Sequence, residues 1–120
     1  SDGCKRKPQR MRNKQNSDLV RKLVEDVVEG NFQNLVNDGR FRVGKIEDFV
    51  AVLNEYPGAL TMPPDEAYED LDMVESVRGD VLVDFDLWYD GKKSDLTLQA
   101  VIETSNEGQK SIYIEDCHVL

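Results

Sequence analysis

The sequence feature that most constrains the fold is a long alternation of apolar and polar residues within residues 80–98. Side chains of an extended chain point alternately to its two faces, so this period predicts a strand with one buried face. The two faces would carry Val81, Val83, Phe85, Leu87 and Tyr89 on one side and Leu82, Asp84, Asp86, Trp88 and Asp90 on the other. A turn at residues 90–93 contains Asp90-Gly91, and the alternation then resumes. The stretch therefore predicts a β-hairpin.

Further strands are predicted on both sides of this hairpin. The returning strand would bury Leu96, Leu98, Ala100 and Ile102. Glu107-Gly108 predicts another turn, and residues 111–120 a last strand with Ile112 and Ile114 on its inner face. Met73, Val74 and Val77 indicate a short strand ahead of the hairpin. Consecutive strands joined by short turns form an antiparallel meander.

The first half of the chain has the helical period instead. Residues 19–28 hold an apolar stripe that Ser17 or Asp18 can cap and Gly30 can end, and a short helical turn is expected at residues 31–36. A second helix is predicted at residues 45–56, with its stripe at Ile46, Phe49, Val50 and Leu53. We therefore predict an α+β fold in which N-terminal helices pack on one face of a three- to four-stranded antiparallel meander sheet.

Charge divides the chain into two parts. The whole chain of 120 residues has a formal net charge of -9. Residues 1–16 contain six bases and one acid, a net charge of +5, which leaves -14 on residues 17–120. The first part has almost nothing to pack into a core. We expect a disordered basic tail at residues 1–16 and a single α+β domain at residues 17–120.

This charge balance limits the partners. An acidic body repels nucleic acid and anionic membranes and favours a basic protein partner. Contact with nucleic acid is expected only through the basic tail, which has no aromatic residue for base stacking. No apolar run approaches the length of a membrane span, and no signal peptide is recognisable, so we expect a cytoplasmic protein with reduced thiols. The oligomeric state stays open.

Two acidic regions are candidate binding surfaces. Residues 65–75 hold six acids and no base, and the polar face of the hairpin combines acids with the only tryptophan. A histidine lies near the end of the last strand. The candidate binding residues are Asp65, Glu66, Glu69, Asp70, Asp84, Asp86, Trp88, Asp95 and His118. The alternative for each is an ordinary solvated or structural side chain.

Catalytic and metal-binding arrangements are poorly supported. Cys117 and His118 are neighbours on a strand and point to opposite faces, so they cannot form a nucleophilic pair. Asp116 and His118 share a face, but a zinc site needs a third protein ligand, for which Asp95 is a candidate. No nucleotide-binding loop, nucleophile elbow or zinc-protease motif is present. We expect no metal or cofactor, and the sequence favours a protein without enzymatic activity.

Several short motifs carry a resemblance. They are Leu87-Trp88, the SDLTL of residues 94–98, the Asp-Cys-His-Val-Leu of residues 116–120 and the Pro-Pro-Asp-Glu of residues 63–66. With these, residues 18–120 resemble an uncharacterised bacterial domain family of unknown function, so no catalytic residue is implied. The sequence departs from that pattern at Cys117, where an aliphatic residue is expected, and in its basic tail. The order of elements loosely resembles nuclear-transport-factor-2-like domains and bacterial immunity proteins.

Two classes of function follow from these observations. The first is a non-enzymatic protein-interaction domain, with an immunity-type inhibitor of a basic toxin as its specific form. The second is a small-ligand-binding or enzyme domain with a pocket between the helices and the sheet, which would have Trp88 or His118 in its wall.

Overall fold

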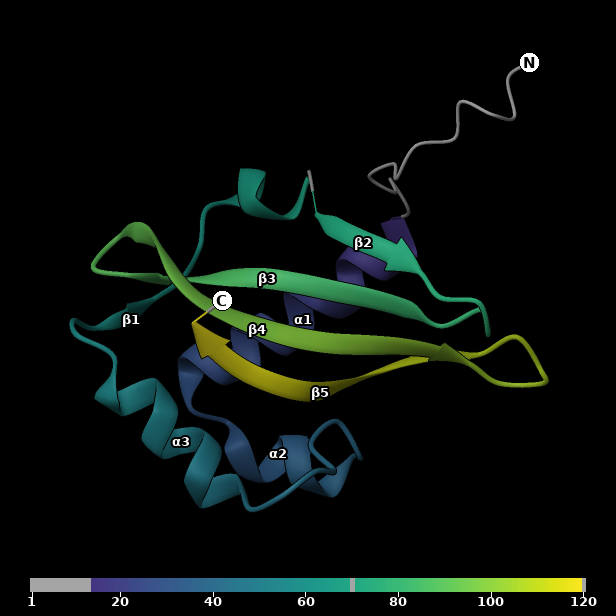
Figure 1. Ribbon diagram of the computed structural model, residues 1–120, viewed down its shortest axis with the longest axis horizontal. Coiled ribbons are helices and arrows are strands. Elements are labelled where there is room, and N and C mark those ends of the chain that lie inside the picture. Colours follow the sequence, from purple (N-terminus) through teal and green to yellow (C-terminus); the bar gives the residue numbers. More distant parts are fainter. Residues whose placement is uncertain (1–13, 70, 120) are drawn as a thin grey trace.

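A computed structural model describes residues 14–69 and 71–119, and it has the predicted α+β order (Figure 1). Residues 1–13, Asp70 and Leu120 lie outside the described residues. The helices are α1 (Lys14–Glu29), α2 (Phe32–Asn37), α3 (Ile46–Glu55) and the 3-10 helix η2 (Asp65–Tyr68). The strands are β1 (Leu60–Thr61), β2 (Asp72–Glu75), β3 (Val81–Tyr89), β4 (Lys92–Thr104) and β5 (Lys110–Val119).

The sheet is antiparallel, and its three long strands form the predicted meander. The two short strands lie in line along the free edge of β3. β1 pairs with Trp88 and Tyr89, whereas β2 pairs with residues 81–84. The five strands therefore occupy four positions across the sheet, which confirms the expected size.

The hairpin turn is tighter than predicted. Asp90 and Gly91 alone connect β3 to β4, with φ angles of 53° and 74°. Two successive positive φ angles match the twist of the paired strands, as in a type I′ turn. The Asp90 carboxylate also accepts a hydrogen bond from the Ala59 N–H at 3.0 Å. Gly58 approaches this carboxylate so closely that a Cβ atom there would lie 2.5 Å from it.

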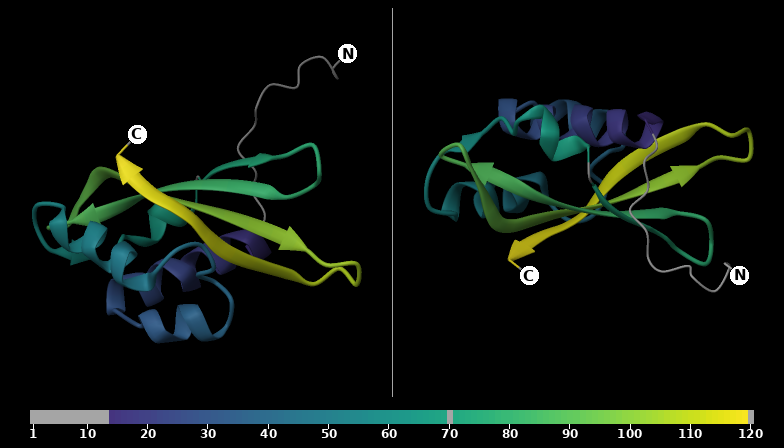
Figure 2. Two further views of the ribbon diagram at one scale, coloured as in Figure 1. Left: turned by 60° about the horizontal axis from the view of Figure 1, so that its bottom comes forward. Right: turned by 90° about the horizontal axis from the view of Figure 1, so that it is seen from above.

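The core lies between the helices and one face of the sheet, which we call the inner face (Figure 2). α1 and α3 insert their apolar stripes there, and the predicted inner residues of the hairpin are all buried. The Tyr68 ring of η2 stacks on Phe85 at a centroid distance of 5.3 Å. The core residues that come from the helices are Val20, Leu23, Val24, Val27, Leu35, Phe49, Leu53 and Tyr68.

A buried ion pair joins α1 to the connector that follows α2. The side chain of Asp26 is 3% exposed, and Arg40 Nη2 lies 2.7 Å from its Oδ2. The Asn31 side-chain amide donates to the other carboxylate oxygen at 3.0 Å. Burial alone would raise the pKa of Asp26, but the hydrogen bonds from Asn31 and Arg40 outweigh it and lower the pKa. The Arg40 carbonyl in turn accepts the Ile114 N–H at 2.7 Å, which ties the connector to β5.

Two boundaries differ from the predictions. Residues 14–16, assigned to the tail, are helical and belong to α1, and Asn16 is fully buried. Lys110 Nζ donates to the Asn16 side-chain oxygen at 3.1 Å, so a contact with β5 extends the helix toward the N-terminus. Val77, expected in the short strand, lies in the turn after β2 and is fully exposed. The remainder of the predicted tail lies outside the described residues.

Candidate functional site

The second face of the sheet, which we call the outer face, carries polar residues in register across the strands. Cross-strand pairing places Asp72, Asp84, Gln99 and Asp116 in one row and Asp86, Thr97 and His118 in the next. Side-chain hydrogen bonds follow these rows, because neighbours on one face of a sheet lie close together. Gln99 donates to Asp84 at 3.1 Å, and the Thr97 hydroxyl donates to Asp86 at 2.8 Å.

A β-bulge in β5 decides which residues near the chain end share this face. Gln99 pairs with Asp116 and Ala100 pairs with Ile114, so Glu115 is the extra residue. Strict alternation from Ile114 would have turned Asp116 and His118 inward. The bulge turns them outward, where His118 Nδ1 lies 3.1 Å from Asp116 Oδ2.

The same bulge turns Cys117 into the core, opposite Leu98. Burial, together with the nearby Asp116 carboxylate, raises the pKa of its thiol to about 12. His118 lies on the opposite face, opposite Thr97. The structure thus confirms that Cys117 and His118 cannot act as a nucleophilic pair.

A second irregularity, in β4, shapes the end of the hairpin. Asp86 pairs with Thr97, and Trp88 pairs with Lys93. Between these two pairs β3 has one residue and β4 has three, so β4 contains two extra residues. The Ser94 hydroxyl fixes the bulge by donating to the Leu87 carbonyl at 2.6 Å and accepting the Leu96 N–H at 3.1 Å. Asp95 is consequently exposed on the bulge, where its carboxylate accepts a hydrogen bond from the Tyr56 hydroxyl.

A cleft opens where the edge of β3 has no neighbouring strand. β1 ends its pairing at Trp88 and β2 begins at Asp84, so Phe85, Asp86 and Leu87 lie in the gap. The chain that joins β1 to β2 passes beside this gap and contributes η2. The cleft has a volume of about 860 Å³, and we call it the Trp88 cleft. Its lining residues are Pro64, Glu66, Ala67, Leu71, Asp72, Asp84, Phe85, Asp86, Trp88, Lys93, Asp95 and Thr97.

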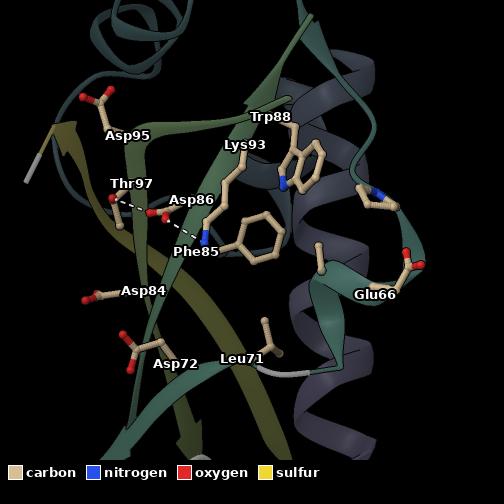
Figure 3. Close-up of a pocket in the computed structure, with 12 residues that line it drawn as sticks. Glu66, Leu71, Asp72, Asp84, Phe85, Asp86, Trp88, Lys93, Asp95 and Thr97 are labelled. Carbon is tan, nitrogen blue, oxygen red and sulfur yellow. Dashed lines mark hydrogen bonds and ion pairs between the residues drawn. The ribbon is translucent and has the colours of Figure 1, made fainter. Parts of the chain in front are cut away.

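The cleft is apolar in the middle and acidic at its rim. Figure 3 shows Trp88, Phe85 and Leu71 around the middle, with the Asp72, Asp84 and Glu66 carboxylates farther out. Five carboxylates line the cleft, and Lys93 is the one basic residue among its lining residues. Lys93 Nζ on β4 lies 3.7 Å from Asp86 Oδ2 on β3, which is a salt bridge between the two strands. The arrangement suits a ligand that combines an apolar stem with a positive charge.

The predicted binding residues divide between this cleft and other surfaces. Glu66, Asp84, Asp86, Trp88 and Asp95 line the cleft. Asp65 instead faces α1, where its carboxylate lies 3.1 Å from Arg21 Nη1. Glu69 is exposed just after η2 and His118 lies across the sheet on β5, whereas Asp70 lies outside the described residues.

Asp72 and Lys93 were not predicted as cleft residues, and neither were Phe85 and Leu71 in the apolar middle. Asp72 belonged to the predicted acidic segment, but only its pairing with Asp84 shows that it joins the outer face. The predicted position of a pocket was also different. No residue of α1, α2 or α3 lines the Trp88 cleft, which lies at the sheet edge. A smaller cavity of about 200 Å³ does lie between α3 and β5.

The described part of the chain shows neither a metal site nor a membrane span. No group of three or more His, Cys, Asp or Glu side chains within residues 14–69 and 71–119 is placed to hold a metal ion. None of the helices in these ranges is long and apolar enough to cross a bilayer.

The fold and site define a small α+β domain with a covered inner face and a charged outer face. Residues 24–120 match the family described as a domain of unknown function, DUF7668. The match covers most of the chain, and the chain therefore belongs to this family. No curated protein and no solved structure matches the chain.

Proposed function

We propose that this chain is a non-enzymatic protein-interaction domain that binds a basic segment of a partner protein in the Trp88 cleft. The observation that carries the proposal is the placement of five carboxylates around an apolar cleft that contains the only tryptophan. A lysine or arginine side chain has the matching structure, because its aliphatic stem packs on apolar surface while its charged end stays in water.

Lys93 gives an internal example of how such a side chain would bind. Its ammonium group reaches the Asp86 carboxylate, as the dashed line in Figure 3 marks. The indole of Trp88 provides an aromatic face on which a second cation can lie. The charge of -14 on residues 17–120 further speeds the approach of a basic partner, an effect that salt weakens.

The test uses the fluorescence of Trp88 during titration with a short oligoarginine peptide. The cleft variant combines Glu66→Gln with Asp72→Asn, and the control variant combines Glu69→Gln with Glu75→Gln. Both variants lose two acids, but Glu69 and Glu75 do not line the cleft. We expect the cleft variant to bind about tenfold more weakly and the control variant to bind nearly as well as the native protein. Equal weakening in both variants would show binding by overall charge and would refute a cleft-specific site.

A basic toxin is the most specific partner within this proposal, with the domain acting as its immunity-type inhibitor. A cytoplasmic location is also part of the proposal, and the buried free thiol of Cys117 supports it. Inhibition of a candidate toxin should then weaken in the cleft variant and persist in the control variant.

A small organic cation is the second candidate ligand. The cleft volume of about 860 Å³ falls in the range of small-molecule sites, which favours this alternative. Titration with spermidine separates the two candidates. Tight, saturable binding of spermidine that oligoarginine cannot match would favour a small-ligand domain, whereas preference for the peptide would favour protein interaction.

A further inference from the structure

One row of the outer face is apolar and lies outside the Trp88 cleft. Val74, Leu82, Val101 and Tyr113 are in register across β2, β3, β4 and β5. We call these four residues the apolar row. It runs across the sheet from β2 to β5, and its members alternate along the strands with the inner-face residues that pack on the helices. None of its members lines the cleft, so the apolar row is a separate surface.

Exposure differs along the apolar row. Val74 is 50% exposed and Leu82 is 43% exposed, whereas Val101 between Leu82 and Tyr113 is only 3% exposed. Val101 is buried but does not belong to the main core cluster. The apolar row thus provides a packed apolar base and two exposed aliphatic side chains.

Arg42 fixes the other end of the apolar row. Its guanidinium carbon lies 4.1 Å from the centre of the Tyr113 ring, and its Nη2 lies 3.3 Å from the Glu103 carboxylate. These contacts hold the Tyr113 ring in place on the outer face. A surface that is already ordered loses less entropy when a partner binds.

Acidic residues flank the apolar row on both sides. Asp72, Asp84 and Asp116 form the next row toward the cleft, and Glu103 follows Val101 on the same face in the other direction. Burial raises the pKa of Tyr113, and the carboxylates of Glu103, Glu115 and Asp80 add to this effect. A second copy packed face to face would bring these acids together, which opposes self-association through this surface.

We propose that the apolar row docks a basic amphipathic helix of a partner protein. Neighbouring strands are about 4.8 Å apart, so four residues in register span about 14 Å. A helix covers that length in about 10 residues. One apolar stripe would lie along the row, and lysine or arginine residues on both sides of the stripe would meet the flanking acids. A helix there would cover the sheet from its open side, and this proposal does not depend on the function of the cleft.

The experiment compares two peptides of identical composition on the full-length protein labelled with 15N. One peptide places its leucines along a single helical stripe among lysines, and the other has the same residues in scrambled order. We expect the patterned peptide to bind about tenfold more tightly and to shift the amide resonances of the apolar row. Equal affinity of the two peptides would show attraction by charge alone and would overturn the proposal.

Substitutions locate the binding. The double variant Val74→Ser with Leu82→Ser should lose the preference for the patterned peptide. Val77→Ser is the matched control, because Val77 is fully exposed but lies in the turn beside β2. The preference should persist in this control variant. Urea unfolding of each variant confirms that its fold is intact.

Two other occupants of the apolar row would also overturn the proposal. A dimer seen by sedimentation of the native protein and lost in the double variant would identify a second copy as the occupant. A spin label on Cys4 that broadens the Leu82 resonance in dilute monomeric protein would identify the chain's own basic N-terminal segment.

Discussion

The inner and outer faces of this sheet are built by the same strands and have opposite chemistry. Val83 and Ala100 point to the helices, whereas their neighbours Asp84 and Gln99 point away from them. The inner face is apolar and almost completely buried, and the outer face holds aspartates that lie opposite one another. Burial of apolar surface stabilises the fold, while like charges in register oppose it. Stability therefore resides in the inner face, and the outer face keeps features that folding does not require.

The first prediction compares buried and exposed aspartates. Asp26→Ala should lower the free energy of unfolding by about 3 kcal/mol, because it removes the buried partner of Arg40 and leaves that guanidinium with only the half-exposed Asp38 carboxylate. Asp84→Ala should change it by less than about 1 kcal/mol. Urea unfolding measures both. Similar losses in the two variants would contradict the assignment of Asp26 as a structural residue.

The Asp26 effect should also depend on pH. The pKa of Asp26 is lowered in the folded protein, so its stabilising contribution is present above the ordinary carboxyl pKa of about 3.9 and is lost as the pH falls through the lower folded value. The difference in unfolding free energy between the native protein and Asp26→Asn should therefore shrink in acid. A difference that stays constant down to low pH would show that the stabilisation by Asp26 does not come from its charge.

The second prediction compares leucines on the two faces of β3. Leu87 is fully buried and Leu82 is 43% exposed. Leu87→Ala should cost about 2–5 kcal/mol, because it removes buried contacts and leaves a cavity. Leu82→Ala should cost about 1 kcal/mol or less. Thermal and urea unfolding of the two variants check this, and equal costs would mean that the outer face is covered in solution.

The third prediction concerns the bulge that shapes one side of the cleft. Ser94→Ala removes the hydroxyl that bonds the Leu87 carbonyl and the Leu96 N–H. We expect a loss of about 1 kcal/mol and shifts in the amide resonances of Trp88 and Asp95. Ser111→Ala is the control, because Ser111 is exposed on β5. An unchanged spectrum for Ser94→Ala would show that the bulge does not need this hydroxyl.

The smallest predicted effect tests the repulsion on the outer face. Asp84 lies directly opposite Asp72, and Asn at this position keeps an oxygen that can accept the hydrogen bond from Gln99. Asp84→Asn should raise stability by up to about 0.5 kcal/mol at low salt, and the gain should fall as salt is added. Glu107→Gln, in an exposed turn, should have no such effect. A loss of stability in Asp84→Asn would show that its charge has a structural partner.

Local patterns in the sequence determined the types of element and the inner face. The alternation in residues 80–98 predicted β3, the turn and β4, because side-chain direction along a strand depends only on position. Helical stripes predicted α1 and α3 for the same reason. Most of the cleft residues on β3 were also predicted, since they alternate with buried positions. The sequence did not predict that these residues gather in one cleft.

Only the tertiary structure decided which residues of different strands meet on the outer face. The bulge at Glu115 exchanges the faces of Cys117 and His118, and no local pattern marks the extra residue. The Trp88 cleft exists because β1 and β2 share one edge of β3 and leave a gap between them. The apolar row joins one residue from each of four consecutive strands. Cross-strand register fixes each of these features, and register depends on pairing between distant segments rather than on any one segment.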